Sequence, residues 1–225
     1  MVAGKAQPSE HNLTITYLTQ YMQNPKATCP ATSGADFLNP EILISAFGFR
    51  TAFGIAQVAE DLDRNGRSWN DVLVDVARIS KAHCQYMIVR WFFSGLQGAT
   101  ELAAPERKVL QTLAYLFALH TLEAEMSEFL ISGYLSPAQG KLVKEQVLEL
   151  IARIRPDAVA LVDALALPDY YLASALGRYD GKVYQSLAEM VEREPLNHTI
   201  VVDGYENYIK PFVYAGLERK KESKL

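Results

Sequence analysis

The chain has 225 residues, of which 49% are hydrophobic and 21% charged, and its formal net charge at pH 7 is −4. This composition is typical of a folded globular protein and excludes intrinsic disorder, which would need fewer apolar residues and more net charge. The charges of both signs are interspersed and no basic stripe occurs, so we expect no nucleic-acid partner.

The first 38 residues are predicted to form an N-terminal segment and a linker. Residues 9–23 have the pattern of a short helix that Ser9 can cap. Residues 24–34 are rich in Pro, Ser, Thr and Gly and predict a loop. Asn39 and Pro40 then supply an N-cap and a proline for the first helical position, so a helix should run from there to about Asp63.

Residues 68–156 predict the remaining helices of a bundle. Ser68 can cap a helix with two neighbouring apolar stripes, which should make this helix well buried. One stripe is Val72, Val76, Ile79, His83 and Met87, and the other is Leu73, Ala77, Ser80, Cys84, Ile88 and Trp91. Residues 106–132 form the next helix, which Gly133 ends. A capping box at Ser136 starts another, which Pro156 must break or kink.

Beyond Pro156 the pattern predicts only short helices, near residues 157–167, 170–176, 183–193 and 203–214. Gly177 is a plausible helix end. A strand-like alternation occurs only weakly, at residues 199–202. We therefore predict an all-α fold, an up-and-down helical bundle with a smaller C-terminal helical cluster. The longest uninterrupted apolar stretches are too short to cross a bilayer, so we expect no membrane span.

Few residues suggest chemistry, and no familiar catalytic or nucleotide-binding motif occurs. His120 and Glu123 lie one turn apart, and Glu125 and Glu128 follow. A di-metal bundle enzyme would need a second such motif, so a solvated acidic face is the favoured interpretation. His83 lies on an apolar stripe and is predicted to be a hydrogen-bonded core histidine. We predict no catalytic residue and no metal site.

One turn combines several chemical groups. Arg178, Tyr179, Asp180 and Gly181 place a cation, an aromatic ring and a carboxylate next to one another. A structural corner, in which Asp180 caps the following helix, is favoured over a ligand contact.

The chain ends on Ser223, Lys224 and Leu225, which form a receptor-read peroxisomal address. A receptor can capture the free carboxylate, the cation and the apolar side chain in matched pockets. Residues 216–225 are predicted to be a charged, extended tail that keeps this address accessible. The address predicts the peroxisomal matrix as the location and the peroxisomal import receptor as a partner.

Several segments together resemble the C-terminal helical part of peroxisomal acyl-CoA oxidases. They are residues 155–164, residues 176–184 around the Arg178–Gly181 turn, residues 83–86, and residues 195–197. Their order and spacing, and the terminal address, match that family over most of the chain. On this resemblance, residues 39–215 form an acyl-CoA oxidase C-terminal-like helical domain, and the four residues Arg178, Tyr179, Asp180 and Gly181 are a family motif.

The resemblance implies a dimeric flavoprotein of fatty acid β-oxidation. The family oxidises fatty acyl-CoA with O₂ to trans-2-enoyl-CoA and H₂O₂, and a glutamate takes the α-proton. The family's Glu-Gly-Glu/Asp-like catalytic segment and its flavin-holding β-domain have no counterpart in this sequence. We therefore transfer no catalytic or FAD-binding residue. We expect FAD and fatty acyl-CoA to bind the complete enzyme, and this chain alone to bind no FAD.

Two functions remain open. The chain is a piece of an acyl-CoA oxidase, whether a fragment, a truncated product or one part of a larger assembly. Its role would then be structural, and it would support a homodimer or pack on the catalytic half. Alternatively, it is a non-enzymatic peroxisomal binding module derived from that domain, with an apolar face as a partner surface.

Overall fold

The computed structural model describes residues 15–222, with side chains as far as residue 217. Within this range the regular structure is helical and no strand is present, so the predicted all-α class is confirmed and the weak strand signal at residues 199–202 is wrong. The chain divides into two compact units, Met1–Ala158 and Val159–Leu225.

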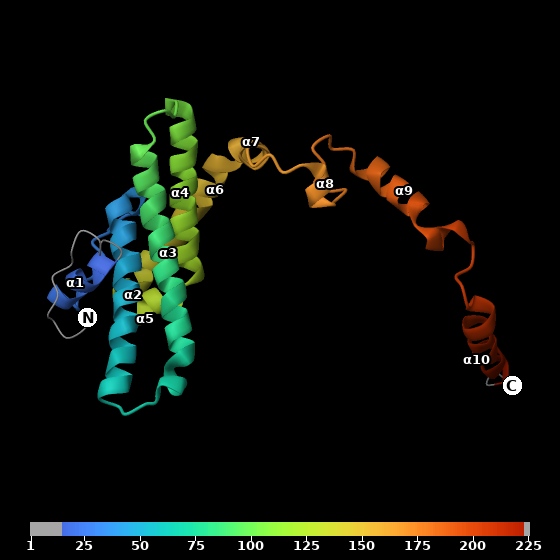
Figure 1. The fold of residues 1–225 in the computed structure, drawn as a ribbon, viewed down its shortest axis with the longest axis horizontal. Helices are drawn as coiled ribbons and strands as arrows, with labels where there is room; N and C mark the ends of the chain where they lie inside the picture. Colours follow the sequence, from blue (N-terminus) through green and yellow to red (C-terminus); the bar gives the residue numbers. More distant parts are fainter. Residues whose placement is uncertain (1–14, 223–225) are drawn as a thin grey trace. The chain divides into compact units, whose positions relative to one another are not determined.

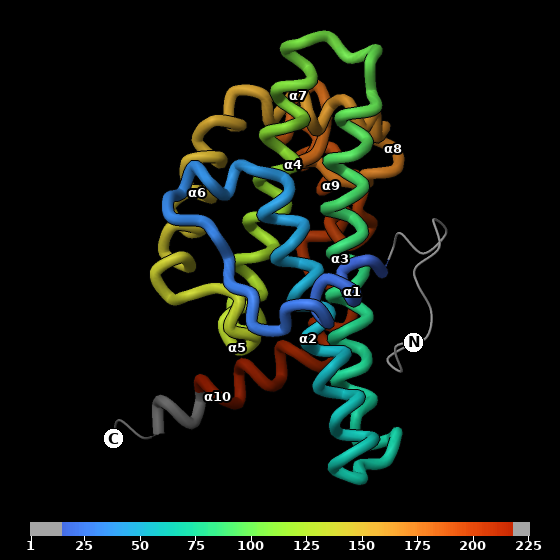
Figure 2. The backbone as a smooth tube through the Cα atoms, turned by 90° about the vertical axis from the view of Figure 1, so that its left-hand side faces the viewer, coloured from blue at the N-terminus to red at the C-terminus, as the bar shows by residue number. Residues whose placement is uncertain are grey.

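The first unit is a bundle of antiparallel helices (Figure 1). Its longer elements are α1 (Thr16–Gln23), α2 (Pro40–Asp63), α3 (Leu73–Gly98), α4 (Ala104–Ala124) and α6 (Pro137–Ile154), with the short α5 (Met126–Ile131) between the last two. Helix α2 packs on α3, α3 on α4, and α4 on α6, while α1 covers part of α2. Figure 2 shows α2, α3 and α4 side by side.

The helix starts follow the predicted capping residues. The Asn39 side chain accepts a hydrogen bond from the Glu41 backbone N–H at 3.0 Å, and Pro40 takes the first helical position. Ser136 likewise accepts from the Gln139 backbone N–H at 3.3 Å. Ser68 instead starts a separate 3₁₀ turn, and α3 begins after it at Leu73.

The predicted helix over residues 106–132 is two helices, because the chain leaves the helical conformation at Glu125. The backbone there has φ −102° and ψ 18°. The Glu125 carboxylate contacts α3, so a tertiary contact overrides the local helical pattern. Gly133 ends α5 with φ +74°, a left-handed conformation that glycine adopts without strain, so this boundary is confirmed.

Helix α2 runs through the centre of the first unit, and its residues 46–52 are all buried. It is long and apolar enough to cross a membrane by those two criteria alone, but 44% of the qualifying window is buried inside the bundle, as in a core helix of a soluble protein. Gly48 permits the close approach of α1, since a Cβ atom there would lie 2.7 Å from the Tyr17 Cβ.

The core of the first unit is built from aromatic and branched side chains. Phe47 of α2 meets Phe129 of α5 edge to face, with ring centroids 5.4 Å apart, and both are fully buried. Part of the predicted linker joins this core, because the Gln139 amide donates to the backbone oxygens of Cys29 at 2.9 Å and Ala31 at 2.8 Å. The linker is therefore an anchored segment of the bundle.

The expectation that α3 is well buried is wrong for one of its two faces. Val72 and Met87 of the first stripe are buried, but Leu73, Ile88 and Trp91 of the second are 47%, 48% and 61% exposed. Within the described residues of the first unit, α3 packs on α1, α2 and α4 and leaves its opposite face to solvent.

The second unit consists of short helices. They are α7 (Ala158–Asp163), α8 (Asp169–Leu172), α9 (Val183–Arg193), a π-helical turn (Tyr205–Ile209) and α10 (Lys210–Glu222). The prediction for α9 is confirmed to the residue. Gly177 ends no helix, because α8 already ends at Leu172, and the next residue, Ala173, has φ +45°. Residues 216–222 continue α10, so the predicted extended tail is helical there.

Candidate functional site

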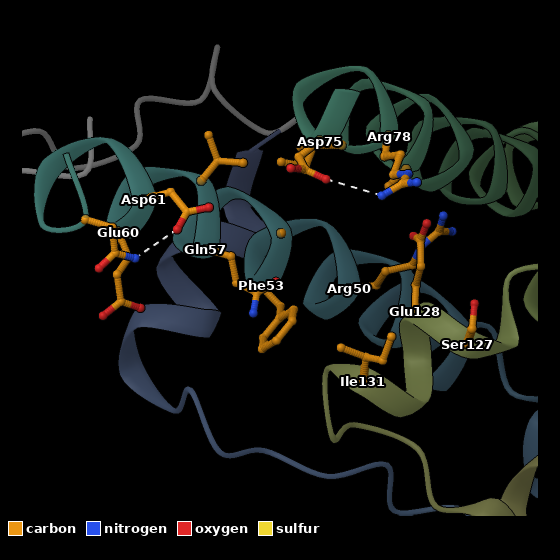
Figure 3. Close-up of a pocket in the computed structure, with 15 residues that line it drawn as sticks. Arg50, Phe53, Gln57, Glu60, Asp61, Asp75, Arg78, Ser127, Glu128 and Ile131 are labelled. Carbon is orange, nitrogen blue, oxygen red and sulfur yellow. Dashed lines mark hydrogen bonds and ion pairs between the residues drawn. The ribbon is translucent and has the colours of Figure 1, made fainter. Parts of the chain in front are cut away.

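A polar pocket of about 670 Å³ lies between α2, α3 and α5 in the first unit (Figure 3). Arg50 and Phe53 line it from α2, and Glu128 lines it from α5. The lining also includes further charged side chains, among them Asp61 and Arg78.

Arg50 is the most unusual residue of this pocket, since it is a cation with only 3% of its surface exposed. Its Nε donates to Glu128 Oε2 at 2.6 Å, and its Nη1 donates to Gln85 Oε1 at 2.8 Å. Nη2 lies 3.6 Å from Glu125 Oε2 and has no hydrogen-bond partner among the described residues. The guanidinium also lies 5.1 Å from the ring centroid of Phe129, within cation–π range.

Glu125 completes the charge balance around Arg50. Its Oε1 lies 2.5 Å from Lys81 Nζ and accepts from Gln85 Nε2 at 3.3 Å. Lys81, followed by Gln85 and Arg50, holds the pKa of the Glu125 carboxyl below its usual range. Two cations and two carboxylates, those of Arg50, Lys81, Glu125 and Glu128, therefore form a balanced network. It joins α2 and α3 to the break between α4 and α5, and each of its four charges lies beside a charge of opposite sign.

Other carboxylates of the pocket lining also have cations beside them. Asp61 is 2.7 Å from Arg67, and Asp75 is 3.3 Å from Arg78. With Glu60 and Glu128, the lining has four carboxylates against two arginines. Both arginines of the lining are already paired with carboxylates, Arg50 with Glu128 and Arg78 with Asp75.

His83 joins α3 to α1 through its ring. His83 is half-buried, and its Nδ1 lies 3.0 Å from the Tyr17 hydroxyl, so the predicted hydrogen-bonded histidine is confirmed. Burial, with the nearby Tyr86, raises the pKa of Tyr17 to about 12. His120 is exposed, whereas Glu125 and Glu128 are directed at Arg50. In residues 15–222, no group of three or more His, Cys, Asp or Glu side chains could hold a metal ion.

The Arg178–Gly181 turn forms a tight corner in the second unit. Arg178 donates from Nη2 and Nε to the two oxygens of Asp180, at 2.6 Å and 3.1 Å, and this pair holds the Asp180 pKa well below its usual range. Asp180 also accepts from the Lys182 backbone N–H at 3.0 Å. That N–H belongs to the residue before α9, so the expectation that Asp180 caps the helix is wrong. Gly181 has φ +69°, and the Tyr179 ring is 82% exposed.

The terminal residues Ser223, Lys224 and Leu225 lie outside the described part of the chain, so the address remains a prediction. Sequence reasoning missed Arg50, although a signal was present. Arg50 is the one charged residue between Glu41 and Glu60 in an otherwise apolar helix. A lone charge in that position must find partners when the helix is buried.

Comparison with known proteins gives a consistent result. The family model described as "Acyl-CoA oxidase" matches residues 39–214. The chain is 34% identical over 200 residues to peroxisomal acyl-coenzyme A oxidase 1 of Arabidopsis thaliana, which covers 86% of this chain and 30% of that protein. The chain thus spans about 30% of the length of this curated relative.

Solved structures agree with the sequence match. Arabidopsis thaliana acyl-CoA oxidase 1 superposes with a TM-score of 0.81 and 32% identity, over 95% of this chain and 32% of that chain. Acyl-CoA oxidase-2 of Caenorhabditis elegans, solved with FAD, ascaroside-CoA and ATP, superposes with a TM-score of 0.71 and 26% identity, over 96% of this chain and 31% of that chain.

Proposed function

Since the chain belongs to the acyl-CoA oxidase family, we propose that it serves as the C-terminal helical part of a peroxisomal, FAD-dependent acyl-CoA oxidase. The complete enzyme would convert fatty acyl-CoA and O₂ to trans-2-enoyl-CoA and H₂O₂ in fatty acid β-oxidation. The match of the family model to residues 39–214 carries this proposal, and the short span relative to the curated relatives supports the restriction to one part of the enzyme.

The role of this part would be structural. Residues 39–215 would form the domain that packs on the catalytic half of the oxidase and supports a homodimer, and residues 216–225 would form the tail. The second unit supports this role, because it exposes large apolar side chains such as Tyr184 and Phe212, at 87% and 82%. Apolar area of this kind is typical of a surface that packs against further protein.

FAD would be held outside the described pocket of this chain. When bound in the complete enzyme, FAD accepts the hydride that leaves the acyl chain. The C. elegans relative binds FAD, whereas the two arginines that line the described pocket, Arg50 and Arg78, are already paired with carboxylates of this chain. We therefore expect the chain alone to bind no flavin and to turn over no acyl-CoA.

Flavin absorbance and H₂O₂ release with a long-chain acyl-CoA test this expectation on the purified chain. A colourless, inactive chain supports the proposal. A yellow chain that turns over the substrate overturns it, because the catalytic and flavin-binding groups would then have to lie within these 225 residues.

The terminal residues Ser223, Lys224 and Leu225 would direct the protein to the peroxisomal matrix through the import receptor. The peroxisomal names of the relatives support this location. A fluorescent protein fused ahead of the chain should enter peroxisomes, and Lys224→Glu should leave it in the cytosol. Equal import of both fusions would exclude the address.

A non-enzymatic binding module is the second candidate. The closed core of the first unit favours it, since a unit with its own core can fold alone. Purification of the chain without other oxidase segments distinguishes the two. A monodisperse species supports the module, whereas solubility only in the presence of the catalytic half supports the oxidase part.

A further inference from the structure

Two nucleophilic side chains lie one helical turn apart on the outer side of α3. The Lys81 side chain is 61% exposed, and Cys84 is an exposed free cysteine. Residues three apart in a helix are neighbours, with about 5–6 Å between their Cβ atoms. The Lys81 amine can therefore reach a group that is bound to the Cys84 sulfur.

Beyond Cys84 the same face of α3 is apolar. Ile88 and Trp91 follow at steps of four and three residues, and they are 48% and 61% exposed. These steps keep the three side chains on one face of the helix. A hydrocarbon chain attached at Cys84 would lie along Ile88 and Trp91, and the burial of its methylene groups there is favourable.

The second described cysteine has neither property. Cys29 is 6% exposed, and its burial raises the pKa of the thiol. A buried thiol of this kind is inert, whereas an exposed thiol can act as a nucleophile. Cys84 is therefore the candidate nucleophile of these two cysteines.

We propose that Cys84 takes an acyl group from a fatty acyl-CoA and passes it to Lys81. In the first step the Cys84 sulfur bonds to the thioester carbonyl carbon, the bond from that carbon to the CoA sulfur breaks, and the thiol proton leaves with CoA as its free thiol. In the second step the Lys81 ammonium releases a proton to water, and its nitrogen bonds to the same carbon. The bond to Cys84 breaks, a further proton of the amine restores the Cys84 thiol, and an amide remains on Lys81. Neither step oxidises or reduces any group.

The ion pair of Lys81 with Glu125 sets the order in which the two adducts appear. Lys81 Nζ lies 2.5 Å from Glu125 Oε1, and this contact favours the ammonium, which has no free electron pair for the attack. The thioester on Cys84 should therefore accumulate before the amide on Lys81. The amide then removes the charge of Lys81 and leaves Arg50 as the cation beside Glu125. Acylation of α3 would in this way alter the network that joins it to α2 and α5.

This inference rests on the proposed function for its acyl donor, since fatty acyl-CoA is the substrate class of the complete enzyme. The modification itself needs neither flavin nor turnover. If no acyl adduct forms, the proposed function still stands, and if the chain binds flavin, this inference still stands.

Incubation of the full chain with hexadecanoyl-CoA, followed by intact-mass and peptide mass spectrometry, tests the proposal. One acyl group should appear first on Cys84, where hydroxylamine releases it as it does other thioesters, and later on Lys81, where it resists hydroxylamine. Cys84→Ser should lose the labile adduct and slow the acylation of Lys81 by about tenfold or more, because the intramolecular donor is gone. Lys81→Arg keeps the cation beside Glu125 and should leave the adduct labile throughout. Both sites are exposed, so circular dichroism should show unchanged folding.

Cys29→Ser and Lys144→Arg are the matched controls, since one removes a buried thiol and the other an exposed amine on α6. Both should acylate as the unmodified chain does. Ile88→Ser should slow the reaction with hexadecanoyl-CoA but leave that with acetyl-CoA unchanged, because an acetyl group has no chain to lie on α3. The proposal is overturned if Cys84 gains no acyl group, if the thioester never moves to Lys81, or if Lys81 is acylated equally fast in Cys84→Ser.

Discussion

The two units of the chain are both rich in apolar side chains but bury them very differently. In the first unit, Phe37, Phe47 and Phe129 are fully buried in one continuous core. In the described part of the second unit, Ala175 is the one buried hydrophobic residue, and rings such as Tyr184 stand 87% exposed. The first unit therefore has the contacts that stabilise a fold, whereas the second has helices without a core.

This difference shows that a segment can form helices without the packed core that makes a fold stable. Local pattern and turns are sufficient to place α9, but a short helix gains most of its stability from the packing of its apolar face. The second unit thus depends on apolar surface supplied by other protein. Matched substitutions in the two units can test this dependence.

The largest expected effect is Phe47→Ala. Phe47 is fully buried against Phe129, so its removal should lower the free energy of unfolding by about 3–5 kcal/mol. Phe212→Ala removes the same atoms from an 82% exposed site and should change it by less than about 0.5 kcal/mol. Urea unfolding followed by circular dichroism measures both. Equal losses would mean that the second unit has a core of its own.

Arg50→Met should have the second-largest effect on stability. It leaves Glu125 and Glu128 without their buried cation, and the free energy of unfolding should fall by about 3 kcal/mol. Arg178→Met is the control in the second unit, where the pair with Asp180 is exposed to solvent and its loss should leave the free energy of unfolding nearly unchanged. The same urea experiment applies. If Arg50→Met were neutral, the network would contribute no stability to the first unit.

Alanine substitutions at two glycines, one in each unit, should have smaller effects on stability than the changes above, and the two effects should be opposite in sign. Gly48→Ala puts a methyl group 2.7 Å from the Tyr17 Cβ and should cost about 1–3 kcal/mol. Gly216→Ala enters open space on α10 and should favour the helix locally by about 1 kcal/mol. The first should lower the urea midpoint. The second should raise helical circular dichroism without moving the midpoint, and a raised midpoint would show that α10 unfolds together with the core.

The sequence predicted what depends on neighbouring residues. The starts of α2 and α6 follow from Asn39 and Ser136, whose side chains act within their own helices. The bounds of α9 follow from its own pattern. Local chemistry is thus sufficient for the helices and for the all-α class.

Contacts between distant segments could not be predicted in the same way. The helix break at Glu125 coincides with ion pairs to charges on α2 and α3, and the pattern of α4 gives no sign of it. The exposed stripe of α3 has the same apolar spacing as the buried one, so periodicity cannot distinguish a core face from an open one. The pocket beside Arg50 was missed because its walls come from three separate helices, and their arrangement in space does not follow from the pattern of any one of them.

The smallest predicted effect is the change in folding stability at acidic pH that depends on Glu125. The folded-state pKa of Glu125 lies below its ordinary value of 4.5, chiefly through Lys81. Above pH 4.5 the carboxylate is ionised in the folded and unfolded states, and its stabilising contribution is fully present. As the pH falls below that value, the unfolded chain takes up the proton first, so the contribution is lost through the lowered folded pKa.

Glu125→Gln should therefore weaken the loss of stability in acid, and should itself cost about 1 kcal/mol at neutral pH. The measurement is the urea midpoint of the first unit from neutral pH to about pH 3. Asp180→Asn is the control, because the Asp180 pKa is also lowered but its partner Arg178 lies in the coreless second unit. Its profile should follow that of the unmodified chain. If Asp180→Asn flattened the acid profile instead, the two units would unfold together and the contrast between them would fail.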